Sequence, residues 1–243
     1  MIKKRLVIAN WKGYIESPEE AKKFAVALRK KTRLFPGVEA WIAPSCPLMP
    51  AVVDALKSSA VKVGAQSAYL VSALTLKNCG AQFAIVGHSE RRSRGETDEE
   101  VGTETANAIS AGLAPVLCVG ESERDPSGAH FSFIEKQLSS ALTRLARPND
   151  LVVAYEPIWT IGKSAEDAMK PADAQEMIIF IRKTLAEIIG RKMALRVPIL
   201  YGGSVEPANA AALITEGGAS GFLVGHASAR IDSFLEILKL CRR

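Results

Sequence analysis

One carboxylate occupies a position in this sequence where chemistry is expected. Glu156 directly follows the apolar run Leu151–Tyr155 and precedes Pro157. A Val-rich run of this length is typical of a strand buried on both faces of a parallel sheet, and Pro157, which lacks an N–H, ends the strand at Glu156. A side chain at the carboxyl end of such a strand faces the crevice where α/β proteins bind ligands. Glu156 is therefore a candidate general base, and the alternative is a structural carboxylate paired with a nearby Lys or Arg.

Other polar residues and glycines also follow apolar, β-branched runs. They are Asn10 with Lys12, His88 with Ser89 and Glu90, Gly202 and Gly203 with Ser204, and Gly225 with His226. Each has a structural alternative: a surface amine for Lys12, a helix cap or core residue for His88, and plain turns for the glycines. Because a helix starting at Ser89 disfavours imidazolium, His88 is expected to stay neutral and to donate a hydrogen bond. Glycines let backbone N–H groups approach an anion, which favours phosphate binding after the last two runs.

The elements that must position these residues alternate along the chain. Eight apolar runs are predicted strands: Leu6–Ala9, Val38–Ala43, Val61–Gly64, Phe83–Val86, Pro115–Val119, Leu151–Tyr155, Val197–Leu200 and Phe222–Val224. Helical periodicity is clear over Pro18–Lys31, Glu99–Ala111, Phe131–Leu145, Ala172–Ile189 and Ala208–Glu216, and less distinct near Leu48–Ser58 and Leu70–Asn78. Eight strand–helix units predict a closed (β/α)8 barrel, with eight parallel strands ringed by helices, as one domain over residues 1–243. In such a barrel the polar groups above meet at one rim.

Composition narrows the class of protein. The 243 residues are 48% hydrophobic and 23% charged, and no apolar run is long enough to span a bilayer, so no membrane partner is expected. Asn10 and Lys12 interrupt the N-terminal apolar run too soon for a signal-peptide core, which favours a cytoplasmic chain. The net charge is only +5, and its densest cluster, residues 29–33, closes a predicted helix without interleaved aromatics. A nucleic-acid partner is therefore not expected.

The cysteines do not form a recognisable pattern. The four are Cys46, Cys79, Cys118 and Cys241. They include no CxxC pair and have no neighbouring His at metal-ligand spacing, so no metal site is expected. We predict that they are reduced, buried small hydrophobes.

Four motifs resemble those of a known family. The segments ANWK at 9–12, GHSERR at 87–92, AYEPIWTIG at 154–162 and YGGSV at 201–205 resemble the signatures of the triosephosphate isomerases, in the family's order and over nearly the whole chain. The resemblance implies a TIM barrel that moves a proton between the two carbons flanking the carbonyl of a phosphorylated triose, without metal or organic cofactor. It implies Glu156 as base, His88, Asn10 and Lys12 at the substrate oxygens, Glu90 as a supporting carboxylate, and Gly162, Ser204, Gly225 and His226 as amide donors to the phosphate. Residues from Pro157 to about Ala165 would form a lid.

The chemistry itself also suits these residue types. Removing a proton from a carbon beside a carbonyl requires a base in a dry site and an electrophile at the oxygen. Glu156 beside Ile158 and Trp159 fits the first requirement. His88 with Lys12 fits the second.

The segment after the third predicted strand departs from the family pattern. The family has a long loop there, with a Thr-Gly-Glu element that enters the partner subunit and supports its catalytic Lys and His. Here Gln66 is followed after a few residues by the predicted helix at Val71. We therefore expect a monomer or an altered oligomer in place of the interlocked homodimer. We also expect reduced activity, because a loosely held site loses rate steeply.

Two smaller departures concern the phosphate end. Residue 226 is His where the family usually has glycine; we expect its ring to point outward, and the alternative is a ring that narrows the phosphate site or adds a donor. The second hinge of the lid reads Lys163-Ser164-Ala165, which could alter opening kinetics. Gly13 and Tyr14 are interpreted as scaffold.

Three other functions compete with this one. The first is an isomerase of another short sugar phosphate, which a substrate comparison would reveal. The second is a Schiff-base aldolase that uses Lys12, which borohydride trapping would detect. The third is a barrel that lost competence with the shortened loop and serves as a scaffold or binder.

Overall fold

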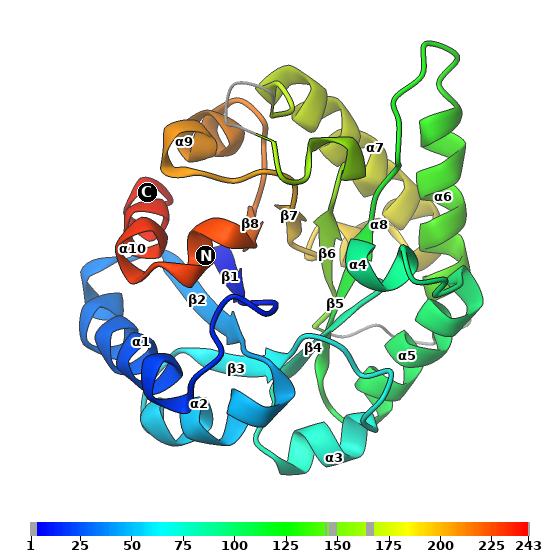
Figure 1. Ribbon diagram of the computed structural model, residues 1–243. Helices are drawn as coiled ribbons and strands as arrows, with labels where there is room; N and C mark the ends of the chain where they lie inside the picture. The colour runs from blue at the N-terminus through cyan, green and yellow to red at the C-terminus, as the bar shows by residue number, and fades with distance from the viewer. Residues whose placement is uncertain (1–3, 144, 146–149, 164–167, 243) are drawn as a thin grey trace.

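The computed structural model describes residues 4–143, 145, 150–163 and 168–242, which form a closed barrel of eight parallel strands ringed by helices (Figure 1). The strands are β1 (Arg5–Asn10), β2 (Val38–Ala43), β3 (Lys62–Ala65), β4 (Phe83–Val86), β5 (Ala114–Val119), β6 (Val152–Tyr155), β7 (Ile199–Tyr201) and β8 (Gly221–Val224). Each strand pairs with the next, and β8 closes onto β1 in parallel register, with Leu6 opposite Gly221. The predicted fold class is confirmed.

The observed strands lie within two residues of the predicted ones at each end. β2 and β4 match the prediction at both ends. β6 ends at Tyr155 rather than at Glu156, yet the Glu156 N–H still donates to the carbonyl of Val119 at 2.8 Å. The sheet therefore fixes the backbone that carries this carboxylate.

The predicted helices occur in the predicted order, with some differences at their ends. The observed helices are α1 (Pro18–Lys31), α2 (Met49–Ala55), α3 (Ala73–Asn78), α4 (Ser89–Arg92), α5 (Asp98–Ser110), α6 (Ala129–Leu142), α7 (Pro171–Ile189), α8 (Arg191–Ala194), α9 (Pro207–Thr215) and α10 (Ile231–Leu240). Two of them, α8 and α10, were not predicted. α3 begins later than predicted because Ser72 caps it, its hydroxyl accepting a hydrogen bond from the Thr75 N–H. The basic cluster of residues 29–33 begins in the last turn of α1, where cations favour the helix dipole.

The core has two layers because successive strand residues face opposite sides of the sheet. In β1, Leu6 and Ile8 belong to the cluster inside the barrel, together with Trp41 and Phe83. Val7 and Ala9 of the same strand belong to the larger cluster between the strands and the helices. With both faces buried, the strands are mostly apolar. Charged side chains within the strands, Arg5, Glu39 and Lys62, lie at or near their amino ends, and the polar side chains predicted to do chemistry lie where the strands end.

The cysteine prediction is half wrong. All four cysteines are free, and Cys118 and Cys241 are buried as expected, but Cys46 and Cys79 are exposed. Cys46 begins a short 3-10 helix and Cys79 caps the end of α3, so both lie at helix ends on the surface. Within the described residues, none of the helices is both long and apolar enough to cross a membrane.

Candidate active site

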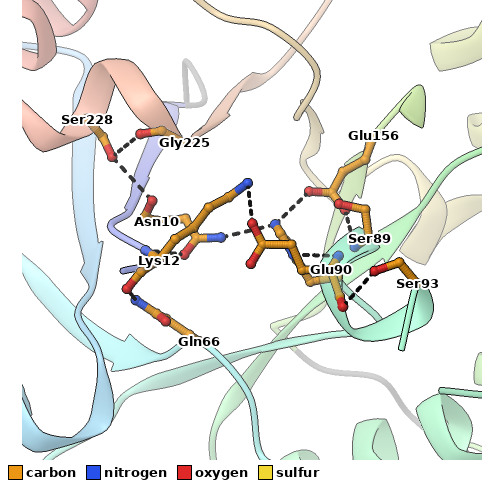
Figure 2. Close-up of polar contacts among 10 residues, drawn as sticks. Asn10, Lys12, Gln66, Ser89, Glu90, Ser93, Glu156, Gly225 and Ser228 are labelled. Carbon is orange, nitrogen blue, oxygen red and sulfur yellow. Dashed lines mark hydrogen bonds and ion pairs between the residues drawn. The ribbon is translucent and has the colours of Figure 1, made fainter. Parts of the chain in front are cut away.

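The polar side chains predicted to meet at one rim do so, around a cavity of about 370 Å³ at the carboxyl ends of the strands. Its lining includes the predicted residues Asn10, Lys12, His88, Glu156, Gly162, Ser204, Gly225 and His226. Glu90 reaches the same cluster through Lys12 (Figure 2). The rim therefore brings together residues from the first and last strands of the chain.

Glu156 is a buried carboxylate with two polar partners. It is 3% exposed; its Oε1 lies 3.1 Å from His88 Nε2, and its Oε2 accepts a hydrogen bond from the Ser89 N–H at 3.0 Å. Gly202 packs against it so closely that a Cβ there would lie 2.9 Å from the Glu156 Cγ. Burial and, next, the charge of Glu156 raise the pKa of the Cys118 thiol well above its usual range, so this neighbour stays neutral.

His88 is oriented by the helix that it caps. It is the N-cap residue of α4, and its Nδ1 accepts a hydrogen bond from the Glu90 N–H at 3.2 Å. An accepting Nδ1 carries no proton, so the neutral ring holds its hydrogen on Nε2, and that N–H faces Glu156. The contacts of Nδ1 with the Glu90 N–H and of Nε2 with Glu156 agree with the neutral donor predicted from the sequence. The Asn10 side-chain nitrogen, 3.1 Å from the same Nε2, is a second donor and does not bond an Nε2 that carries the hydrogen.

Lys12 has a left-handed backbone and an ion-paired amine. Its φ is 48°, which is uncommon outside glycine, and its Nζ lies 2.8 Å from Glu90 Oε1. Burial alone would raise the pKa of the Glu90 carboxyl. The hydrogen bond and the charge of Lys12 lower this pKa by more, so it lies below its ordinary value. Glu90 is therefore a carboxylate that holds the lysine in place.

The residues predicted to bind a phosphate also line the cavity. Gly162, Ser204, Gly225 and His226 line it, as predicted, and the Ser204 hydroxyl donates to the carbonyl of Lys163 at 2.6 Å. This bond ties the turn after β7 to the predicted lid. The structure describes the lid to Lys163; the predicted hinge residues Ser164 and Ala165 lie outside the described residues.

One interpretation in this part of the cavity needs correction, and His226 makes a contact that the sequence did not predict. Tyr14 was expected to be scaffold, yet it lines the cavity. The His226 ring is exposed, but it also lies edge-to-face against the Tyr14 ring, with centroids 5.2 Å apart and planes at 83°. The turn after β1 passes close to that after β8, because these strands are neighbours in the closed barrel. The His226 ring thus packs against Tyr14 in the lining of the cavity.

Sequence reasoning missed three residues that support the site. Glu121, which is 2% exposed, accepts hydrogen bonds from the Tyr155 hydroxyl at 2.8 Å and from Trp159 Nε1 at 2.9 Å, anchoring the start of the predicted lid. Gln66 donates to the Lys12 carbonyl at 2.9 Å, and Ser228 donates to the carbonyl of Gly225 at 2.7 Å (Figure 2). Gln66 and Glu121 come one and two residues after β3 and β5, so the strand-end rule applied to those strands would have found them.

The fold and the site together define a (β/α)8-barrel enzyme of the acid–base type, with a carboxylate facing a neutral imidazole. The family model of triosephosphate isomerase matches residues 5–241. The chain is 40% identical to the triosephosphate isomerase of Thermus thermophilus, over 97% of this chain and 98% of that protein. It is 36% identical to that of Carboxydothermus hydrogenoformans, over 98% and 99%, and 37% identical to that of Streptococcus gordonii, over 98% of each. The chain belongs to the triosephosphate isomerase family.

Proposed function

We infer that this chain interconverts D-glyceraldehyde 3-phosphate and dihydroxyacetone phosphate in glycolysis and gluconeogenesis. The observation that carries this function is the contact between Glu156 and His88, at 3.1 Å, in the lining of a cavity that glycine-bearing turns also line. A base and a neutral donor at one end suit a carbonyl, and backbone turns at the other suit a phosphate.

Glu156 moves the proton. Its carboxylate takes a proton from the carbon beside the carbonyl, which leaves an enediolate, and returns it to the neighbouring carbon. The carbonyl shifts by one carbon, and atoms and electrons balance within the substrate. Because Glu156 is 3% exposed, little water competes for the proton.

His88 stabilises the enediolate oxygens. Its Nε2–H, which faces Glu156 Oε1 here, donates to a substrate oxygen once the carboxylate turns toward the substrate carbon. Asn10 and the ammonium of Lys12 act from the other side of the same oxygens. Glu90 pairs with Lys12 and holds it in place, and this engaged amine also argues against a Schiff-base aldolase, which needs a free amine.

The phosphate is held at the opposite end. The backbone amides of Gly162, Ser204, Gly225 and His226 would donate to its oxygens, and the charge of Lys12 attracts it. A Cβ on Gly225 would lie 3.7 Å from Lys12 Nζ, so the amine is close to this backbone. The lid would close over the phosphate through the contact between Ser204 and Lys163.

We further propose that the protein works in the cytoplasm as a monomer, with residues 1–243 forming one domain. Only Gln66–Ser72 separate β3 from α3, too short a segment to enter a partner subunit. Light scattering at several protein concentrations tests this state, and a dimer that buries residues 66–72 would contradict it.

The decisive experiment measures the initial rate of conversion of glyceraldehyde 3-phosphate by the wild type and by Glu156→Gln over a wide range of protein concentration. The amide keeps the shape of Glu156 but cannot accept the proton. We expect turnover in the wild type only, with a specific activity independent of concentration. Wild-type turnover no greater than that of a folded Glu156→Gln variant would refute the function.

A further inference from the structure

We propose that Gln66 and Tyr69, in the short segment after β3, are positioning residues that support Lys12 and the turn from His88 to Glu90 from within the same chain. This inference rests on the function proposed above and names the groups that hold its site in shape. Neither residue is among those that line the cavity in the described part of the chain. They would therefore act through the residues they contact.

Gln66 holds the end of β1. Its Nε2 donates to the carbonyl of Lys12 at 2.9 Å and to that of Ala43 at 3.0 Å, so both amide hydrogens are used. The Ala43 carbonyl also accepts from the Trp11 N–H at 3.1 Å. One side chain thus joins the ends of β1, β2 and β3.

The hydrogen bond from Gln66 reaches Lys12 at a residue whose backbone conformation is strained. A φ of 48° is unfavourable for a residue with a Cβ and persists only when the surroundings hold it. The hydrogen bond from Gln66 to the Lys12 carbonyl is one such restraint on this backbone (Figure 2). Without it, the lysine backbone can relax and carry the ammonium away from the substrate oxygen.

Tyr69 holds α4. The guanidinium carbon of Arg91 lies 4.0 Å from the centroid of the Tyr69 ring, within the range of a cation–π contact. Arg91 also pairs with the buried Glu96, its Nε lying 3.3 Å from Glu96 Oε1. A charged partner and an aromatic face together restrict this side chain, and with it the helix turn that carries it.

That helix turn presents three groups of the site. His88 caps it, the Ser89 N–H donates to Glu156, and Glu90 pairs with Lys12. A small rotation of α4 moves all three relative to Glu156. Catalytic rates fall steeply when reacting groups lose alignment, so a loss of this contact should lower kcat more than it raises KM.

The test compares matched variants of the folded protein. Gln66→Met keeps the length of the side chain but removes the donor, and Tyr69→Leu removes the aromatic face, while Tyr69→Phe keeps it. Leu70→Ala is the neighbouring control, because Leu70 is 85% exposed. We expect kcat to fall about 10-fold in Gln66→Met and about 3-fold in Tyr69→Leu, with KM within about 2-fold, and Tyr69→Phe and Leu70→Ala to match the wild type.

Three outcomes would overturn the inference. They are unchanged kcat in both Gln66→Met and Tyr69→Leu, a rise in KM alone, or an equal loss in Tyr69→Phe and Tyr69→Leu. Tyr69 lies at the surface, 46% exposed, so its variants should fold even where Gln66→Met does not.

A second readout does not depend on turnover. Nitrogen-15 NMR of the imidazoles reports the orientation of His88 through its Nε2–H signal, which is assigned by its loss in His88→Gln. We expect this signal to shift or broaden in Tyr69→Leu and to be retained in Tyr69→Phe. A wild type without isomerase activity would refute the proposed function, whereas an identical His88 signal in both Tyr69 variants would refute the positioning role of Tyr69.

Discussion

The two ends of the cavity are built differently. At the acid–base end, Asn10, His88 and Glu156 are each no more than 6% exposed and make side-chain contacts with one another. At the end proposed to hold the phosphate, Gly162, Lys163 and His226 are exposed, and the groups proposed to bind it are backbone amides. Proton transfer needs a fixed direction and little water, whereas an anion that must enter and leave needs access. The comparison predicts that variants at the first end change kcat and variants at the second change KM.

The largest effect is expected from His88→Gln. The N–H of glutamine lies at a different position from the His88 Nε2–H. Glutamine also has no ring that the Glu90 N–H could orient, so stabilisation of the enediolate oxygens is lost. We expect kcat to fall about 100- to 1000-fold, with KM changed little. Steady-state kinetics in both directions measure this, and a variant that loses mainly substrate affinity would place His88 at the binding end instead.

Gly202→Ala should break the acid–base end without removing any of its functional groups. The added Cβ would lie 2.9 Å from the Glu156 Cγ, so the carboxylate must shift. We expect kcat to fall about 10- to 100-fold, because small displacements of a base are costly. Gly13→Ala, at a position with no atom within 4 Å of the new Cβ, is the control. Equal rates for the two variants would show that Glu156 tolerates the shift.

A buried carboxyl in α5 should make the stability of the fold depend on pH. Glu104 is buried in α5, and both its oxygens lack a partner among the described residues unless a proton is shared with Glu96. Burial, and then the charge and hydrogen bond of Glu96, raise the pKa of Glu104 from 4.5 to about 7. Between about pH 4.5 and about pH 7, Glu104 therefore keeps a proton in the folded chain that it has lost in the unfolded chain. The free energy of unfolding decreases as the pH rises through this range.

Denaturant unfolding at pH 5 and pH 8 measures this dependence. Glu104→Gln stays neutral at both pH values, so we expect it to gain about 1–3 kcal/mol relative to the wild type at pH 8, and much less at pH 5. An equal gain or loss at the two pH values would mean that Glu104 does not carry this proton.

The smallest effect is expected at the rim of the phosphate end. If Tyr14 holds the His226 ring at the cavity mouth, Tyr14→Ala and His226→Gly should change the KM of the triose phosphate and the inhibition constant of inorganic phosphate by about 2- to 5-fold, with kcat unchanged. Tyr14→Phe keeps the ring and serves as control. Unchanged constants in His226→Gly would mean that only its backbone takes part.

Most of the candidate site was predictable because its residues follow strands in the sequence. Glu156 and His88 come one and two residues after β6 and β4, and a closed parallel barrel places all strand ends at one rim. Gln66 and Glu121 obey the same rule but lie in no motif that suggested chemistry. Tyr14 could not be assigned, since its partner His226 is adjacent only after β8 pairs with β1.

The sequence by itself determined the alternation of strands and helices and the polar residues at the strand ends, because burial on both faces requires apolar strands and leaves polar groups at their ends. Only the tertiary structure decided which of these groups meet. His88 contacts Asn10 across 78 residues of chain, and the Ser89 N–H contacts Glu156 across 67. The position of the His88 proton and the support of Lys12 by Gln66 depend on hydrogen bonds whose distance and direction arise when the barrel closes.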